Sequence, residues 1–425
     1  MKKLLALLLC LALTLGCAAA FAEEAPIKLT LWTFQELHTQ LYKTMEAKWN
    51  AEPDKPKIEI DYQVYPYDDM HNKLTIALQN KGEGAPDLVD IEINMFANYL
   101  KGEIGLAPMN DYVEPIEDHL VMSRLNNYAK DGKFYGIDHH IGATVMFYNT
   151  AILEAAGVDY TTIKTWDDFH EAGKVVLEKT GKPMIVWESA DCWSIYPMVN
   201  QHGGDWLTPD GQVRMDEQVV IDTLAFMKAM LDDNTAIPCP GGWTHTEEYW
   251  GWMNGGNCAA VCMPFWYLDR FTNYMPDLKG QMKVAPMPLW ADGGHKSAQM
   301  GGTGTAVVAT SANVDIAKEF LAYACLSFDG CVTTWQICGF DPILKDVYGS
   351  EEMKAPNQFF EYYDQDLFAM LSSVLDDIPD TCISEYFPTA TDIVKTQMAY
   401  RLVELREDPE QIAKDCAEEL RGQIE

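Results

Sequence analysis

The chain has few basic residues for its length. Its 425 residues include 31 lysines and arginines against 64 aspartates and glutamates, which gives a formal net charge of −33 at pH 7. Proteins that bind nucleic-acid phosphates, or that dock on anionic membranes through charge, need clustered positive residues. The balance therefore argues against a nucleic-acid partner and against electrostatic membrane docking, and it favours a neutral or cationic ligand.

Short motifs of several enzyme and metal-site classes are missing. There is no Cys-x-x-Cys pair, no His-Glu-x-x-His and no Gly-x-Ser-x-Gly, so neither a zinc site nor a serine hydrolase is indicated. Gly301-Gly302-Thr303-Gly304 lacks the Lys-Ser/Thr of a nucleotide loop and precedes an expected strand, so we interpret it as close backbone packing. We expect no metal and no cofactor.

Long hydrophobic runs are also rare, and the one that matters is at the start. Lys2-Lys3 precede an apolar stretch from Leu4 to Leu15, and Ala20-Phe21-Ala22 fits a signal-peptidase site. The stretch is too short to count on as a membrane span. We expect residues 1–22 to be an export signal, with lipid attachment at Cys17 as the alternative.

The cysteines do not form a disulfide framework by spacing. Removal of residues 1–22 leaves nine of the 11, an odd number, and most have apolar neighbours, as in Asn257-Cys-Ala-Ala-Val-Cys262. We therefore expect free, buried thiols and a reducing or anaerobic habitat.

What the sequence does contain is an alternation of strands and helices. Strands are expected at 27–33, 58–65 and 85–92, with helices at 40–49 and 68–80 between them. This order predicts a doubly wound, largely parallel α/β sheet. Ligands of such sheets bind beyond the carboxyl ends of the strands. That rule selects Trp32, Gln35, Glu36, Asp90 and Glu92.

Tryptophans and acids follow other expected strands. Flat aromatic rings bind the apolar faces of sugars, while carboxylates bind the hydroxyls. Core packing is the alternative for each tryptophan, and a solvated strand end is the alternative for each acid. We assign Trp49 and Trp166 to packing. The further candidates for ligand contact are Trp187, Glu188, Asp191, Trp193, Trp250, Trp252 and Trp266.

A segment in the middle of the chain holds two strands almost in line. Asp131-Gly132 signals a turn, a short strand is expected at 134–137, Gly142 interrupts, and an apolar strand is expected at 143–148. The pair suits a crossing between two lobes, where a few residues absorb a change of angle. Spacing alone leaves a hairpin within one sheet equally open.

A resemblance to a known family favours the crossing between lobes over the hairpin. The segment resembles the hinge of the extracellular sugar-binding proteins of ABC importers, of the maltose-binding type. The similarity rests on Asp131-Gly-Lys-Phe-Tyr-Gly136, on Tyr148-Asn149, on Ala155-Ala156-Gly157 and on Thr165-Trp-Asp-Asp-Phe169, and it runs in order along most of the chain. It implies a periplasmic-binding-protein-like type II α/β fold with two doubly wound lobes joined by a hinge.

The resemblance also implies lobe bounds and a function. Lobe I would comprise 27–139 plus 298–345, and lobe II 140–297 plus 346–425. The protein would be no enzyme but the extracytoplasmic substrate-binding component of an ABC transporter. As a monomer, it would bind an oligosaccharide by hinge closure and deliver it to the permease subunits. Residues 145–180 look most like receptors for arabino-oligosaccharides. A secreted glycoside hydrolase, or a receptor for a polyamine or peptide, is the alternative.

One departure from the family concerns the hinge. Asp138 stands where many relatives carry proline, so we expect a less rigid hinge here. His139 and His140 follow it, and His139 joins the ligand-contact candidates, as do Gly301 and Gly302 at the expected return crossing.

Overall fold

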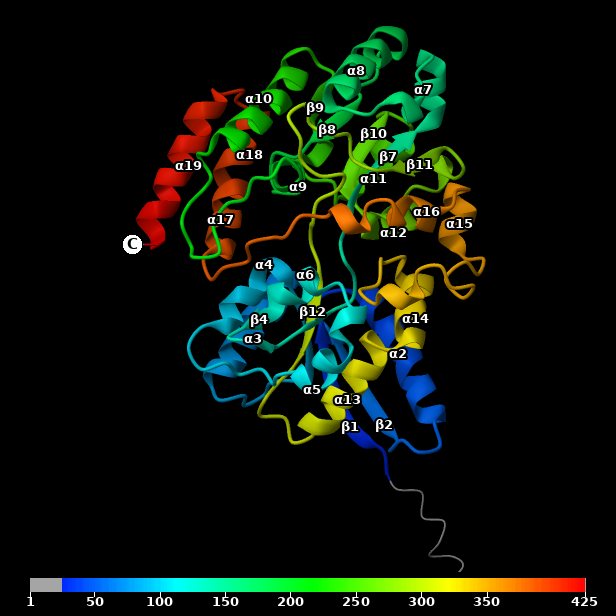
Figure 1. Ribbon diagram of the computed structural model, residues 1–425, viewed down its shortest axis with the longest axis vertical. Coiled ribbons are helices and arrows are strands. Elements are labelled where there is room, and N and C mark those ends of the chain that lie inside the picture. Colours follow the sequence, from blue (N-terminus) through cyan, green and yellow to red (C-terminus); the bar gives the residue numbers. More distant parts are fainter. Residues whose placement is uncertain (1–24, 425) are drawn as a thin grey trace, which may run out of the picture.

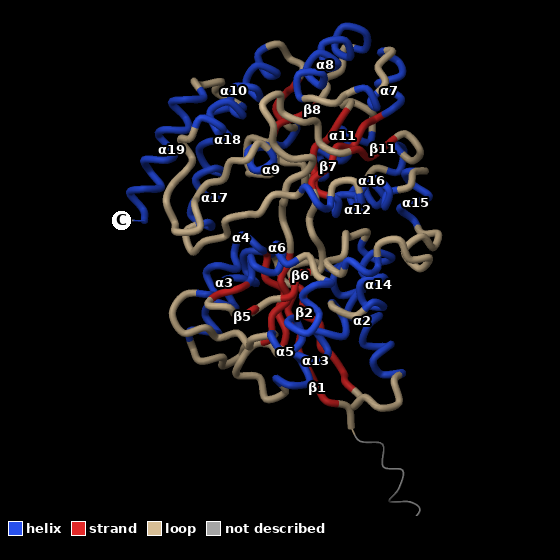
Figure 2. Tube along the Cα trace, viewed as in Figure 1, coloured by secondary structure: helices blue, strands red, loops and turns tan. Residues whose placement is uncertain are grey.

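A five-stranded sheet forms the centre of the first lobe, which is the lower one in Figures 1 and 2. The computed structural model describes residues 25–424, so the expected export signal and Cys17 lie outside the described residues. The strand order is β2-β1-β3-β12-β6. The bounds are β1 (Ile27–Thr33), β2 (Ile58–Val64), β3 (Leu88–Glu92), β6 (Ile137–Asp138) and β12 (Thr303–Val307).

Most neighbours in this sheet are related as expected. β1 is parallel to β2 and to β3, whereas β12 is antiparallel to both β3 and β6. The predicted largely parallel sheet is therefore correct, apart from one reversed strand that enters from the other lobe.

Amphipathic helices cover the sheet. Buried Leu41, Met45 and Trp49 recur at helical spacing on α2, which confirms the packing role predicted for Trp49. The helices of this lobe are α2 (Glu36–Ala51), α3 (Tyr67–Gln79), α4 (Ile93–Phe96), α5 (Asn110–Val113), α6 (Met122–Leu125), α13 (Val314–Cys325) and α14 (Phe328–Cys338), with a 3₁₀ turn η2 (Ala97–Leu100) and the small hairpin β4 (Ala129–Lys130) and β5 (Lys133–Phe134).

The second lobe is built around β7 (Thr144–Asn149). β10 (Ala260–Pro264) and β11 (Met282–Ala285) pair antiparallel with its two edges, and β8 (Ile185–Trp187) pairs parallel with β9 (Ala236–Pro238). Its helices are α7 (Thr150–Ala156), α8 (Trp166–Thr180), α9 (Ile195–Gln201), α10 (Gln218–Asp232), α11 (Glu247–Asn254) and α12 (Leu268–Tyr274).

The start of α8 is as predicted. The Asp168 N–H donates to the Thr165 hydroxyl at 3.1 Å, and the Asp168 carboxylate accepts from the Thr165 N–H at 2.9 Å. This capping box satisfies two N–H groups that a helix start otherwise leaves free. Trp166 beside it is 1% exposed, so its packing role is confirmed.

The C-terminal helices complete the second lobe on two sides. α15 packs on α12 and β11, while α18 and α19 lie beside α10 and α17 packs on α19 (Figure 1). Their bounds are α15 (Gln358–Tyr363), α16 (Leu367–Ser372), α17 (Phe387–Ile393), the π-helical turn η11 (Val394–Met398), α18 (Ala399–Val403) and α19 (Pro409–Ile424). α17 also contacts α4 and η2 of the first lobe, so the lobes touch here. The lobe bounds given above stay a prediction.

Segments between the lobes connect β6 to β7, β11 to β12, and α14 to α15. β6 belongs to the first sheet and β7 to the second, so the central segment is a crossing and not a hairpin. The single strand expected at 134–137 is wrong in detail. Lys133–Phe134 pairs with β4, and Ile137–Asp138 pairs with β12.

A fully buried ion pair joins two of these crossings. The Arg124 Nε donates to Asp138 at 2.6 Å, and its Nη1 donates to the Gln299 side chain at 3.2 Å. The same guanidinium donates to the carbonyl of Gly301. Asp138 also accepts from the Thr303 N–H at 3.3 Å. Asp138 is thus bonded to both crossings, and the less rigid hinge expected from the missing proline stays a prediction.

The third crossing is fixed to the first by Asp341. Its carboxylate accepts from the N–H of Ala143 at 2.9 Å and of Gly142 at 3.3 Å, and its carbonyl accepts from the N–H of Ile141 at 2.8 Å. Gly142 has φ +73°, and a side chain there would meet the Met300 carbonyl at 2.9 Å. The three crossings therefore form one hydrogen-bonded hinge.

The structure also bears on the state of the cysteines and on whether any helix could cross a membrane. All nine cysteines within residues 25–424 are free, and all but Cys382 are buried, which confirms the expected free thiols. In that same range no helix combines the length and the apolar character that a bilayer crossing requires.

We predict that Arg124→Met lowers the free energy of unfolding by about 3–5 kcal/mol, because it leaves the Asp138 carboxylate buried and unpaired. Chemical denaturation followed by tryptophan fluorescence measures the loss. Arg214→Met is the matched control, since Arg214 pairs with Glu217 at the surface at 2.7 Å. We expect it to cost about 1 kcal/mol or less. Equal losses in the two variants would contradict the role of the buried pair.

Candidate ligand site between the lobes

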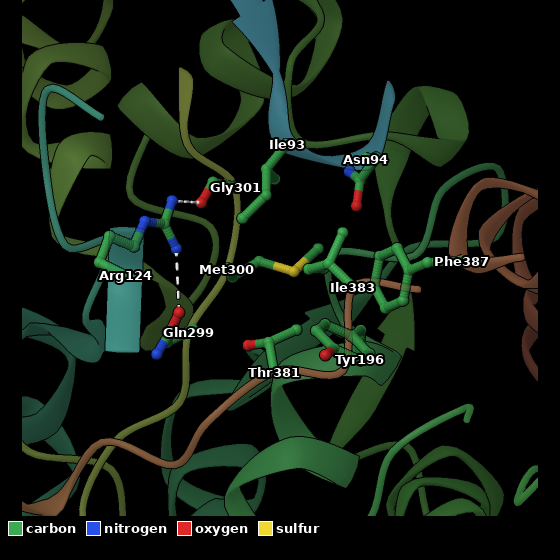
Figure 3. A pocket seen from close by; sticks show the side chains of 10 residues that line it. All are labelled: Ile93, Asn94, Arg124, Tyr196, Gln299, Met300, Gly301, Thr381, Ile383 and Phe387. Carbon is green, nitrogen blue, oxygen red and sulfur yellow. Dashed lines mark hydrogen bonds between the residues drawn. The ribbon is translucent and has the colours of Figure 1, made fainter. Parts of the chain in front are cut away.

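The contact between the lobes encloses a cavity of about 10 Å³, shown in Figure 3. Such a volume holds about one water molecule, whereas pockets for small ligands span roughly 300–1,000 Å³. The lining comes from α4, α6 and α9, from the second crossing, and from α17 with the segment before it: Ile93, Asn94, Arg124, Tyr196, Gln299, Met300, Gly301, Thr381, Ile383 and Phe387. This cavity is therefore too small for a sugar, which would require the lobes to part here.

A cluster of aromatic rings lies next to this cavity. We call Trp193, Trp243, His245, Trp266 and Tyr267 the aromatic cluster. The His245 ring is its centre, with centroid distances of 5.0 Å to Trp243, 5.4 Å to Tyr267, 5.5 Å to Trp266 and 5.8 Å to Trp193. Burial, followed by the nearby positive charge of Arg270, holds the pKa of His245 well below its usual range, so its ring is neutral.

The aromatic cluster touches the hinge directly. The Trp266 indole N–H donates to the Met300 carbonyl at 3.2 Å. A Cβ at Gly301 would lie 2.9 Å from the Trp193 ring and 3.2 Å from the Trp266 nitrogen, so only glycine permits this approach. Gly302 has φ +143°, and a Cβ there would overlap the Arg124 guanidinium. The close packing predicted for these glycines is confirmed.

Glu188 lies behind the aromatic cluster, fully buried. Its Oε1 accepts from the N–H of Thr244 at 2.9 Å and from the Thr244 hydroxyl, while its Oε2 has no partner. Burial raises the pKa of Glu188 to about 8, although the Thr244 bonds oppose the rise. The carboxyl is therefore protonated at neutral pH.

Glu92 and Asp191 come from opposite lobes. The Glu92 carboxyl accepts from the Tyr67 hydroxyl at 3.0 Å and from the Asn94 N–H at 2.9 Å. Asp191 pairs with Lys395 of η11 at 3.3 Å. Burial raises the pKa of Glu92 to about 7, and the charges of Lys395 and Asp191 act on it with opposite signs.

Asp90 and His139 belong to a buried polar network that includes side chains of strands β3 and β12 of the first sheet. Asp90 bonds to His38 Nδ1 at 2.9 Å and accepts from the Thr305 hydroxyl at 2.7 Å. His139 Nε2 lies 2.7 Å from the Tyr42 hydroxyl. Burial alone would raise the pKa of Asp90, but its bond to His38 and the histidine charges outweigh burial and hold it at about 2. This network keeps both residues away from solvent.

The other sequence candidates lie apart from the aromatic cluster. Trp32 is 3% exposed, with Lys73 Nζ 4.0 Å above its ring, and Trp187 is 1% exposed in the second core, so neither presents a free ring face. Trp250 stacks on Tyr274 at 4.0 Å, and Trp252 packs near Tyr249. Gln35 occupies the N-cap position of α2 without a side-chain capping bond, and Glu36 is exposed in its first turn. Their ligand contacts stay a prediction.

Sequence reasoning missed several residues of this region. His245, Trp243 and Lys395 were not singled out, and neither was Arg124. Trp243 and His245 follow strand β9 through a Gly241-Gly242 turn, and the aromatic richness of this stretch was the available signal. Arg124 and Lys395 lie in helical segments whose sequence has no such mark.

We predict that the Glu188 proton makes stability depend on pH. The unfolded chain releases this proton above its ordinary pKa of 4.5, whereas the folded chain keeps it to about 8. The folded state thus binds the extra proton, and stability falls by up to about 1.4 kcal/mol per pH unit across that window.

Glu188→Gln removes this contribution, so its unfolding free energy should decline less than the wild type's between pH 5 and pH 8. Urea titrations at several pH values measure the difference. The exposed Glu171, paired with Lys174, supplies the control Glu171→Gln, which should keep the wild-type slope. An unchanged slope in Glu188→Gln would contradict a neutral, buried Glu188.

Comparisons with known proteins agree with this architecture. The family model for bacterial extracellular solute-binding proteins matches residues 35–325. An arabinooligosaccharide-binding protein of Bacillus subtilis (strain 168) is 41% identical over 432 residues, covering 99% of this chain and 100% of that protein. A protein of the same description from Halalkalibacterium halodurans is 41% identical over 405 residues, covering 95% and 91%.

Solved structures show the same fold. The GacH receptor of Streptomyces glaucescens GLA.O superposes with a TM-score of 0.77 at 21% identity, covering 94% of this chain and 98% of that one. An ABC transporter associated binding protein from B. animalis subsp. lactis Bl-04 gives 0.77 at 22%, covering 93% and 97%. The resemblance found in the hinge segment is confirmed, and the chain belongs to the bacterial extracellular solute-binding protein family.

Proposed function

We propose that this protein is the substrate-binding component of an ABC importer and that it binds arabino-oligosaccharides between its two lobes. The aromatic cluster at the hinge is the observation that supports a sugar as the ligand. The sugar class rests on the two relatives that are 41% identical over nearly their full lengths and are described as arabinooligosaccharide-binding proteins.

The ring geometry suits a carbohydrate. The ring centroids of Trp193 and Trp266 are 5.4 Å apart, and the ring planes meet edge to face at 83°. The two rings therefore present their faces in different directions. An oligosaccharide offers apolar C–H faces on successive rings, and each face buries well against an indole at a small entropy cost. Trp193 is partly exposed, which leaves part of its ring for a ligand.

The charges favour a neutral ligand. Glu188 is protonated at neutral pH, the His245 ring is neutral, and Asp191 is already paired with Lys395. A cation such as a polyamine would require ionised carboxylates that are not already paired. The hydroxyls of a sugar can instead exchange hydrogen bonds with neutral groups.

Binding would proceed by hinge closure. The three crossings are bonded to each other through Arg124, Asp138 and Asp341, so the lobes can rotate about one fixed region. The small volume between the closed lobes means that the sugar enters an open form. The closed form with sugar would then be the state that the permease subunits recognise.

The proposal extends to location and partners. The protein would act as a monomer outside the cell membrane, without catalysing a reaction on its ligand. Lipid at Cys17 would hold it there, or cleavage after Ala22 would release it.

Binding to a panel of oligosaccharides tests the proposal. Residues 23–425 are titrated with arabinan, xylan, maltodextrin and galactoside oligomers, putrescine and a short peptide, while tryptophan fluorescence and thermal shift are recorded. We expect saturable binding of the arabinan series with no new reducing ends. Release of smaller sugars would favour a glycoside hydrolase, and a response to putrescine or peptide alone would overturn the sugar assignment.

Trp193→Ala and Trp266→Ala should each weaken binding of the arabinan oligomers about 30-fold, the roughly 2 kcal/mol of a well-buried aromatic contact. Isothermal titration calorimetry measures the affinities. Trp290→Ala is the matched control, because Trp290 stacks on His202 at 4.1 Å in the second lobe, outside the cluster. Wild-type affinity in both cluster variants would remove the aromatic cluster from the site.

A further inference from the structure

The helix that follows the lobe contact is interrupted by a π-helical turn. α17, η11 and α18 run without a break from Phe387 to Val403, and η11 (Val394–Met398) is the π-helical part. Such turns insert one residue into a helix, shift the side chains that follow, and occur often at functional sites. Here the turn contains Lys395, which no motif in the sequence singles out.

Lys395 neutralises a carboxylate that is nearly removed from water. Its Nζ lies 3.3 Å from Asp191 Oδ2, and the Asp191 side chain is only 9% exposed. The other Asp191 oxygen accepts from the Cys192 N–H at 2.7 Å. An unpaired carboxylate at this depth is costly, so the ion pair with Lys395 stabilises this part of the second lobe.

The first lobe presents its own carboxyl at the same contact. α17 packs on α4, and α4 starts directly after Glu92. The charge of Lys395 lowers the pKa of Glu92 while the charge of Asp191 raises it, and Asp191 also contributes to the raised pKa of Tyr67. Charges on the two lobes therefore act on each other across the contact.

We propose that Lys395 is a positioning residue for lobe closure, holding Asp191 of the second lobe and Glu92 of the first against one another in the closed form. The inference rests on the proposed function, since closure is the step that traps the sugar. Without the lysine, two carboxyl groups would face each other across the contact, and their repulsion would favour the open form.

Protonation of Glu92 then becomes coupled to closure. Glu92 is buried in the closed form, where it faces Tyr67 and His71 of α3. From the second lobe, the charges of Asp191 and Lys395 act on its pKa. Separation of the lobes exposes Glu92 to water and lowers its pKa, so closing takes up a proton. Sugar affinity should therefore decrease as the pH rises through about 7, the pKa of Glu92 in the closed form.

The test compares two lysine variants of the full chain. Lys395→Met removes the contact, and Lys414→Met is the control, because Lys414 pairs with Glu410 on α19 at the surface. Calorimetry measures sugar affinity between pH 5.5 and pH 8.5, and small-angle X-ray scattering measures the radius of gyration with and without sugar. We expect Lys395→Met to bind about tenfold more weakly and to remain more open with sugar, while Lys414→Met matches the wild type.

A second substitution separates charge from packing. Asp191→Asn combined with Lys395→Met removes both members of the ion pair, so it should recover at least half of the lost affinity, and Glu92→Gln should flatten the pH dependence. Wild-type affinity and scattering in Lys395→Met, or no recovery in the double variant, would overturn the proposal. If the wild type itself bound no sugar of the panel, the proposed function would fail, and the ligand-free scattering of the lysine variants would still test the contact.

Discussion

The ion pair between Arg124 and Asp138 is the interaction on which the arrangement of the molecule depends. Both side chains are fully buried where two segments cross between the lobes, so each charge must be satisfied by fixed partners. Besides each other, they bond to the Gln299 side chain, the Gly301 carbonyl and the Thr303 N–H of the second crossing, which holds the backbone around Gly301 in place. The aromatic cluster contacts Met300 and Gly301, so its geometry is set by the hinge.

The chemistry of the site is unlike that of the surface around it. The chain carries a net charge of −33, yet the acids nearest to the aromatic cluster are protonated, paired or hydrogen-bonded within the protein. Low local polarity strengthens the few hydrogen bonds that remain available to a ligand. The overall charge therefore bears on solubility and self-repulsion, while the proposed site offers aromatic rings and neutral polar groups.

The sequence allowed the first strands and helices of the first lobe, the capping box of α8 and the crossing at 131–150 to be predicted, because each depends on local periodicity, local capping or a family motif. It could not separate Trp187 from Trp193, since one ends strand β8 and the other follows it closely, and only tertiary packing decides which ring is exposed. Arg124, Asp341 and Lys395 were missed for a related reason. Their hydrogen-bond and ion-pair partners are between 14 and 204 residues away in the sequence, so no local pattern marks these pairs.

The glycine at 301 has a consequence for how such a receptor can be altered. Because it lacks a side chain, the ring of Trp193 rests on the backbone of the crossing without any intervening group. Recognition and motion are therefore not separate modules here. A change that enlarges or reshapes the aromatic cluster also displaces the backbone of the hinge. Selection or engineering for a different sugar must therefore find substitutions that preserve the hinge geometry while they alter the rings.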